Sequence, residues 1–153
     1  MPEVVRTRRI AAPPSAVWDV LARFDRIVDW APNVDHSSYL TGQRSGACAS
    51  RRVHTGSLTL VETVTRWEDE VVLGYSIAGL PPVVSKVETR WELAVDGDGT
   101  VVTVTSDITS GPRPPMKVAA KAVARRLGAA NQTMLDGLAD HVEHATTAPG
   151  ANA

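Results

Sequence analysis

A carboxylate within an apolar segment is the residue of clearest chemical potential in this sequence. Glu62 lies in LTLVETVTRW, and if Leu60 and Val64 face the interior, the two-residue period of a strand puts Glu62 on the same side. A buried carboxylate is costly unless it is paired, so Glu62 would need a partner. We therefore predict Glu62 as a catalytic acid or base, or as a ligand contact. If the strand has the opposite register, Glu62 lies on the outer face of the sheet and is simply hydrated.

Three histidines are further candidates for acid or base catalysis, because an imidazole titrates near neutral pH. His36 lies in a polar loop and His54 directly before a probable hairpin turn, and both contexts favour ordinary surface residues. His141 falls on the apolar side of a helix near its end. There it could close a cavity, or it could simply pack and interact with the helix dipole.

Large aromatic residues could form the walls of a ligand cavity. Trp30 lies close to a loop, and the alternation of their strands points Tyr75 and Trp91 inward. Such residues are also ordinary core residues. Ala120 and Ala130 on the facing helix leave room, which favours a ligand role for Tyr75 and Trp91.

Four more residues complete the predicted ligand-binding set. Thr89 shares the inward face of its strand with Trp91, and Met134 offers an adaptable apolar side chain on the helix. Asn131 lies at the edge of the apolar stripe, where its amide either orients a ligand or contacts solvent. Leu80 begins the stiff apolar segment 80–84, which is either a cavity lid or a tight strand connection.

Arginines could bind a carboxylate on a ligand. Arg51, Arg66 and Arg90 are the candidates, although alternation puts Arg90 on the wet face of its strand.

A strand-rich segment from residue 47 to 108 must position these side chains. Turn residues near 55–56, 68–69, 80–82 and 96–99 divide it into strands. Inward faces are predicted from the two-residue period, and the residues assigned to them are Ser85, Val87, Thr89, Trp91, Leu93 and Val95 in one strand, Val71, Leu73, Tyr75 and Ile77 before it, and Val102, Val104, Ser106 and Ile108 after it.

Helices are predicted at both ends of this segment. A first strand at 3–10 precedes two short helices, the first carrying an apolar spacing from Val17 to Phe24. A long amphipathic helix spans 114–145. Its apolar stripe consists of Met116, Ala120, Val123, Leu127, Ala130, Met134 and Leu138. The tail, 146–153, is small and polar, and we expect it to be disordered.

Composition limits the classes of function. The 153 residues fit one domain, 1–145, with a net charge of −1. Basic residues are spread along the chain apart from short runs such as Arg125-Arg126, which argues against nucleic acid as the main partner. Neither a metal-ligand spacing nor a disulfide framework is present, because Cys48 is the only cysteine. We expect no metal, no cofactor, no integral membrane segment and a cytoplasmic location, and the oligomeric state stays open.

The order of these segments resembles the SRPBCC superfamily, also called START-like or helix-grip proteins, and within it the polyketide cyclase/dehydrase group. The resemblance rests on APPSAVWDVLARFDRIVDWAPNV, LTLVETVTRWEDE, YSIAGLPPVV, TRWELAVDGDGTVVTV and the long final helix. It implies an α+β fold in which a curved antiparallel sheet of about seven strands grips the final helix around a cavity. Relatives usually place a capping residue where Pro13 stands, so the start of the first helix differs here.

Three functions follow as hypotheses. The first is binding of a hydrophobic or amphipathic small molecule, lipid- or polyketide-like, in a cavity on the order of 300 Å³. The second, suggested by the resemblance, is an aromatase/cyclase or dehydratase with Glu62 as its acid or base. The third is a protein-interaction or toxin–antitoxin module with a vestigial pocket.

Overall fold

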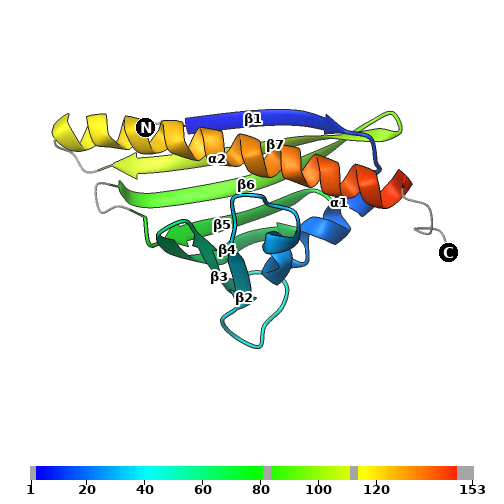
Figure 1. The fold of residues 1–153 in the computed structure, drawn as a ribbon, viewed down its shortest axis with the longest axis horizontal. Coiled ribbons are helices and arrows are strands. Elements are labelled where there is room, and N and C mark those ends of the chain that lie inside the picture. Colours follow the sequence, from blue (N-terminus) through cyan, green and yellow to red (C-terminus); the bar gives the residue numbers. More distant parts are fainter. Residues whose placement is uncertain (1–2, 81–83, 111–113, 148–153) are drawn as a thin grey trace.

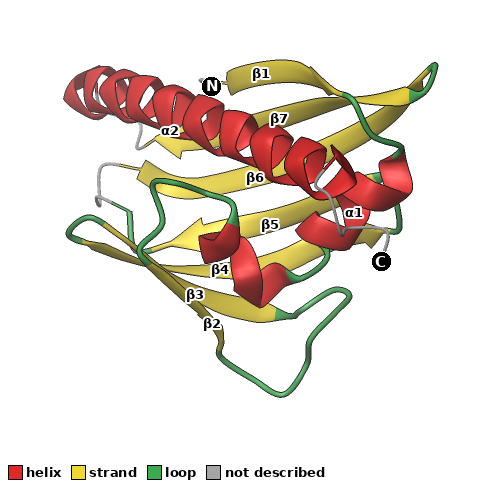
Figure 2. Ribbon diagram, turned by 45° about the vertical axis from the view of Figure 1, so that its right-hand side comes forward, coloured by secondary structure: helices red, strands yellow, loops and turns green. Residues whose placement is uncertain are grey.

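A curved antiparallel sheet and one long helix dominate the computed structural model, which describes residues 3–80, 84–110 and 114–147. Within those ranges seven strands follow the order β1-β7-β6-β5-β4-β3-β2, and α2 crosses the concave face of the sheet (Figures 1 and 2). The predicted helix-grip fold is confirmed. Its elements are β1 (Glu3–Ile10), α1 (Pro14–Leu21), η1 (Phe24–Asp29), β2 (His36–Tyr39), β3 (Ser50–Thr55), β4 (Leu58–Glu68), β5 (Val72–Ala78), β6 (Val84–Asp96), β7 (Gly99–Ser110) and α2 (Pro114–Thr147).

Alternate side chains along each strand form the inner face of the sheet. In β6, Val87, Thr89 and Trp91 are buried as predicted. The predictions fail at strand ends. Val95 is 73% exposed because it adjoins the β6–β7 turn, and Val71 is 52% exposed because it lies in the turn before β5. Ser85, near the start of β6, is exposed as well.

Two hairpin turns set the register of the central strands. Gly56 between β3 and β4 has φ +58°, and Gly97 between β6 and β7 has φ +62°. This left-handed conformation is strained for residues with a Cβ atom, so glycine suits both turns. The first turn pairs Arg51 with Glu62. These positions agree with the turns predicted from the sequence.

Two short helices close one end of the sheet. α1 begins at Pro14, in a first turn where the missing N–H costs nothing. Pro13 provides no side-chain cap, as its sequence predicts. α1 buries Val17, Trp18 and Leu21, and η1 follows as a 3₁₀ helix. Both helices therefore contribute their apolar sides to the core.

The long helix uses a wider apolar surface than the predicted stripe. Val123, Leu127 and Met134 are only half-buried, whereas Ala120 and Leu138 are buried as predicted. The other deeply buried side chains of the helix lie beside the predicted stripe, namely Ala124, Asn131, Leu135, Ala139 and Val142. His141, predicted on the apolar side, is exposed. α2 continues to Thr147, two residues beyond the predicted end, and most of the predicted disordered tail, 148–153, lies outside the described residues.

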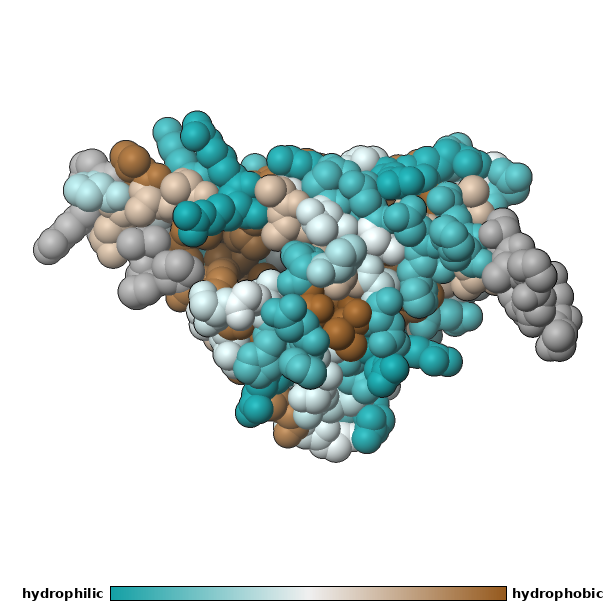
Figure 3. Space-filling model, in the orientation of Figure 1, coloured by the Kyte–Doolittle hydropathy of each residue, from teal (hydrophilic) through white to brown (hydrophobic). Residues whose placement is uncertain are grey.

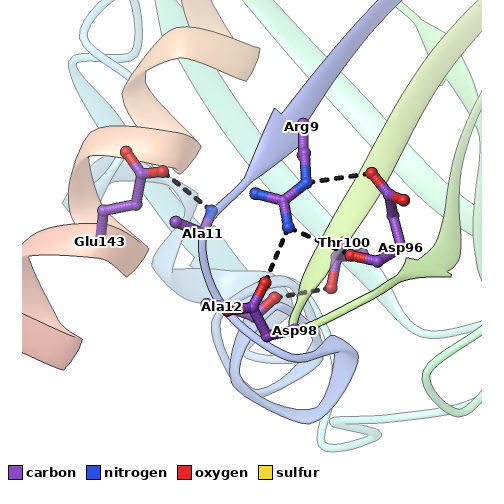
Figure 4. Close-up of polar contacts among 7 residues, drawn as sticks. All are labelled: Arg9, Ala11, Ala12, Asp96, Asp98, Thr100 and Glu143. Carbon is purple, nitrogen blue, oxygen red and sulfur yellow. Dashed lines mark hydrogen bonds and ion pairs between the residues drawn. The ribbon is translucent and has the colours of Figure 1, made fainter.

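Polar contacts fasten the C-terminal half of α2 to the sheet (Figure 4). The backbone N–H of Ala11, just after β1, donates to Glu143 Oε2 at 2.9 Å. Beside it, Arg9 binds Asp96 Oδ2 at 3.0 Å and Asp98 Oδ1 at 2.9 Å in the β6–β7 turn. The exposed ion pairs contribute little stability individually, but together with the Ala11 hydrogen bond they join β1, α2 and the β6–β7 hairpin at one end of the molecule.

Candidate ligand cavity

A cavity of about 200 Å³ lies between the sheet and the middle of α2. Figure 3 shows this face hollowed and apolar beneath the N-terminal half of the helix. Most lining side chains are apolar, with a few polar groups among them. They are Ile27, Asn33, Val34, Val53, Thr55, Leu58, Leu60, Glu62, Tyr75, Ile77, Leu80, Thr89, Val123, Arg126, Leu127, Ala130, Asn131 and Met134.

Aromatic packing limits the cavity to about 200 Å³, which is of the same order as the roughly 300 Å³ that the ligand-binding hypothesis requires. Trp30 and Trp91 meet edge to face with ring centroids 5.6 Å apart. Phe24 and Tyr75 make a second such contact at 5.7 Å. These rings fill the end of the space between sheet and α2. Trp30 and Trp91, predicted as ligand contacts, are therefore core residues that do not line the cavity.

Glu62 lies on the inner face of β4 and is 5% exposed. Its Oε1 accepts from Arg51 Nε at 2.7 Å and lies 2.6 Å from Arg51 Nη2. Arg51 is 2% exposed, and its Nη1 donates to the carbonyl oxygen of Phe24 at 2.8 Å. Arg51, a predicted partner for a ligand carboxylate, is therefore already paired with the carboxylate of Glu62. Oε2 of Glu62 forms no hydrogen bond with any described residue, so this atom is the one available to the cavity.

Tyr75 lies beside this ion pair. Burial raises the pKa of its hydroxyl well above the usual value, and the negative charge of Glu62 raises it further. The hydroxyl oxygen accepts from Trp91 Nε1 at 3.1 Å. The guanidinium of Arg51 lies 4.9 Å from the Tyr75 ring centroid. Tyr75 therefore stays a protonated hydrogen-bond donor at neutral pH, at the wall of the cavity.

A second polar group joins α2 to the sheet. Asn131 Nδ2 donates to Ser106 Oγ at 2.9 Å, and Ser106 Oγ shares a hydrogen bond of 2.7 Å with Thr89 Oγ1. All three residues are at least 97% buried. Because its nitrogen is held by Ser106, Asn131 has its carbonyl Oδ1 left for the cavity. Thr89 and Asn131 both line the cavity.

The structure brings most of the predicted site together. Glu62, Tyr75, Thr89, Leu80, Ala130, Asn131 and Met134 all line the cavity. Of the predicted lid, 80–84, residues 81–83 lie outside the described residues. The ion pair between Arg51 and Glu62 was missed, although counting back from the Gly56 turn would have paired these positions. Val123, Leu127 and Arg126 on α2 were also missed as lining residues.

The other candidate residues lie away from the cavity. His36 and His54 pair across β2 and β3, with ring centroids 6.4 Å apart, and neither lines it. Arg90 binds Glu92 and Asp107, and Arg66 binds Glu68, on other surfaces. Within the described ranges, no three His, Cys, Asp or Glu side chains come together as a metal site, and no helix is long and apolar enough to span a membrane.

Solved structures share this fold at low sequence identity. The Zhui aromatase/cyclase from Streptomyces sp. R1128 has a TM-score of 0.81 at 18% identity, and the match covers 96% of each chain. A protein from Thermus thermophilus has a TM-score of 0.77 at 22% identity, with 95% of this chain and all of that chain covered. A START superfamily protein from Mycobacterium smegmatis has a TM-score of 0.72 at 18% identity, covering 93% of this chain and 97% of that chain.

Family assignment comes from the sequence itself. No curated protein matches the chain. The profile of one family, described as polyketide cyclase/dehydrase and lipid transport, matches residues 1–143, from the start of the chain almost to the end of α2. The chain therefore belongs to the polyketide cyclase/dehydrase and lipid transport family.

Proposed function

We propose that this protein binds a small, largely apolar molecule in the cavity between the sheet and α2. The observation that carries the proposal is an apolar wall interrupted by a few buried polar groups, which is the usual composition of a small-molecule site. A volume of about 200 Å³ suits a ligand with a single ring, two fused rings or a short acyl chain. The family description, which includes lipid transport, agrees with such a ligand.

Polar groups in the wall define the ligand further. Glu62 Oε2 and Asn131 Oδ1 are both hydrogen-bond acceptors, and the Tyr75 hydroxyl is a donor. A carboxylate on the ligand would meet the negative charge of Glu62 in a poorly solvated space, which is unfavourable. The proposed ligand is therefore uncharged in the part that enters the cavity, and it carries a hydroxyl or amide group.

A cavity-blocking variant tests this proposal with 1-naphthol as the probe. Ala130 lines the cavity and Ala129 is exposed on α2, so Ala130→Phe fills the cavity whereas Ala129→Phe adds the same ring to the outer surface. We expect calorimetry to show 1-naphthol binding to the wild type and to Ala129→Phe, and at least a 10-fold loss in Ala130→Phe, since 1.4 kcal/mol corresponds to about tenfold. Equal binding by all three proteins would place the probe elsewhere.

A second candidate function is an aromatase/cyclase-type reaction, which the proximity of Glu62 and Tyr75 in the wall favours. Glu62 would remove a proton from a carbon between two carbonyls of a polyketide-like chain. That carbon would attack a second carbonyl, whose oxygen receives a hydrogen bond from the Tyr75 hydroxyl. The new alkoxide would then take the proton back from Glu62. The cyclisation thus balances without any other reactant.

Substitution of the base tests this second function. Glu62→Gln keeps the size of the side chain but cannot accept the proton, so turnover of a polyketide-type substrate should fall by about 100-fold or more. Thermal unfolding of the variant, followed in parallel, separates loss of catalysis from loss of fold. Full turnover by a folded Glu62→Gln protein would remove Glu62 from the mechanism and leave ligand binding as the function.

A further inference from the structure

Charge is strongly segregated along α2. All four lysines and arginines of the described helix, Lys117, Lys121, Arg125 and Arg126, precede its first acidic residue, Asp136. From there to the end of the helix the chain contains no lysine or arginine. Together with the Arg125-Arg126 run, Lys117 and Lys121 place four cations within ten residues of this helix.

The positions of these cations are electrostatically unfavourable for the helix itself. Partial positive charge at a helix N-terminus disfavours cations in the first turns, and Lys117 lies there. Lys117, Lys121 and Arg125 follow one another at a spacing of four, which brings like charges together on one surface of the helix. Residues that are electrostatically unfavourable in their own helix are found most often at functional sites.

The two halves of α2 differ in how their charges are paired. Lys117, Lys121, Arg125 and Arg126 are all exposed, and none forms an ion pair with another described residue. In the acidic half, by contrast, Asp136 Oδ1 accepts from Arg8 Nη1 at 2.8 Å. Part of the negative charge of the acidic half is thus already neutralised within the chain. This disfavours an antiparallel pairing in which the acidic half of one copy binds the basic half of another.

The basic half also lies next to the cavity. Arg126 belongs to the cavity wall together with Val123 and Leu127 on the same helix. Val118, between the cations, is 69% exposed. In Figure 3 the apolar hollow lies directly beneath this half of the helix, bordered by hydrophilic side chains. Of these four cations, only Arg126 borders the cavity, whereas Lys117, Lys121 and Arg125 lie near Val118 on the solvent side of the helix. A surface of cations with an exposed valine among them matches a bilayer surface, where anionic headgroups cover apolar chains.

We propose that the basic half of α2 docks the protein on an anionic lipid surface. Four cations are within the number that gives reversible attraction to anionic lipids. Docking itself needs no ligand, so it stands or falls independently of the proposed ligand binding.

Vesicle co-sedimentation tests the proposal. The wild-type protein is mixed with vesicles of phosphatidylcholine alone or of equal parts phosphatidylcholine and phosphatidylglycerol. The helix variant carries Lys117→Gln, Lys121→Gln and Arg125→Gln. A matched control with the same change in net charge carries Arg44→Gln, Arg52→Gln and Lys86→Gln, all at exposed positions outside α2. Circular dichroism verifies that both variants are folded.

We expect the wild type to bind only the anionic vesicles, and to be released by high salt. The helix variant should bind on the order of 100-fold more weakly, because each cation near the surface contributes about 1 kcal/mol, whereas the control should lose less than about 3-fold. Three results would overturn the proposal: no binding to anionic vesicles, equal binding to neutral vesicles, or equal losses in the two variants. An acidic protein captured by a wild type that ignores vesicles would assign the cations to that partner instead.

Discussion

Arg51 and Glu62 face each other across the β3–β4 hairpin and form an ion pair in which both side chains are less than 10% exposed. Two nitrogens of Arg51 reach the same carboxylate oxygen, at 2.7 and 2.6 Å. A third nitrogen donates to the Phe24 carbonyl, and the guanidinium lies 3.7 Å over the Phe24 ring. Arg51 thus links β4 to η1, and it fixes Glu62 at the wall of the cavity.

Removing one member of this pair should be strongly destabilising. Arg51→Met leaves the Glu62 carboxylate buried without its cation, so we expect the free energy of unfolding to fall by about 3–5 kcal/mol. The double variant Arg51→Met/Glu62→Leu removes both charges and should recover much of that loss. Urea unfolding of the four proteins in the cycle measures both effects. Arg66→Met, which breaks the exposed pair with Glu68, should cost about 1 kcal/mol or less. Equal costs for the buried and exposed pairs would contradict this prediction.

Tyr75 should make stability fall at alkaline pH. Its folded-state pKa is raised by burial and by Glu62, whereas in the unfolded chain the hydroxyl ionises near the usual value of about 10. Above that pH the unfolded state releases a proton that the folded state retains. The stabilisation is therefore complete below about pH 10 and declines above it, by up to about 1.4 kcal/mol per pH unit.

Tyr75→Phe isolates this contribution. The variant cannot ionise at this position, so its free energy of unfolding should decline less steeply above pH 10 than that of the wild type, as measured by urea unfolding at several pH values. Tyr39→Phe is the comparison: burial also raises the pKa of this half-buried tyrosine, so the variant should change the slope in the same direction but by less. Identical slopes for Tyr75→Phe and the wild type would show that the Tyr75 pKa is not raised.

Close packing of α2 on Trp30 requires a glycine. A Cβ atom on Gly137 would lie within 2.2 Å of the Trp30 carbonyl oxygen and 2.6 Å of Pro32 Cδ. Gly137→Ala should therefore destabilise the protein by roughly 1–3 kcal/mol in thermal or urea unfolding, even though alanine is the better helix former. Gly42→Ala, where a Cβ atom meets nothing within 4 Å, should change stability by less than about 0.5 kcal/mol. A neutral Gly137→Ala would mean that the helix can move away from Trp30.

Ser106 is the shared partner of two cavity residues. Ser106→Ala deprives Thr89 Oγ1 and Asn131 Nδ2 of their common hydrogen-bond partner in a buried setting, so we expect a loss of about 1–3 kcal/mol in urea unfolding. Ser38→Ala on exposed β2 is the matched control and should be within about 0.5 kcal/mol of the wild type. An equally neutral Ser106→Ala would indicate that water replaces the hydroxyl.

The sequence alone predicted the fold and the inward direction of several strand side chains. Two-residue alternation placed Thr89 and Trp91 inward, and helical periodicity identified α2. These features follow from backbone geometry, because side-chain direction repeats with a fixed period in each kind of element. Predictions failed where an element ends, as at Val95, since the period does not show where the covering layer stops.

Tertiary structure alone decided the contacts between segments far apart in the sequence. The cavity is small because Phe24 and Trp30, in and just after η1, meet Tyr75 of β5 and Trp91 of β6, and no local pattern encodes such packing. Glu62 Oε2 is available because Arg51, on the neighbouring strand, binds the other carboxylate oxygen, Oε1. Local periodicity determines which way a side chain points, whereas the volume left between side chains depends on how distant elements pack against each other.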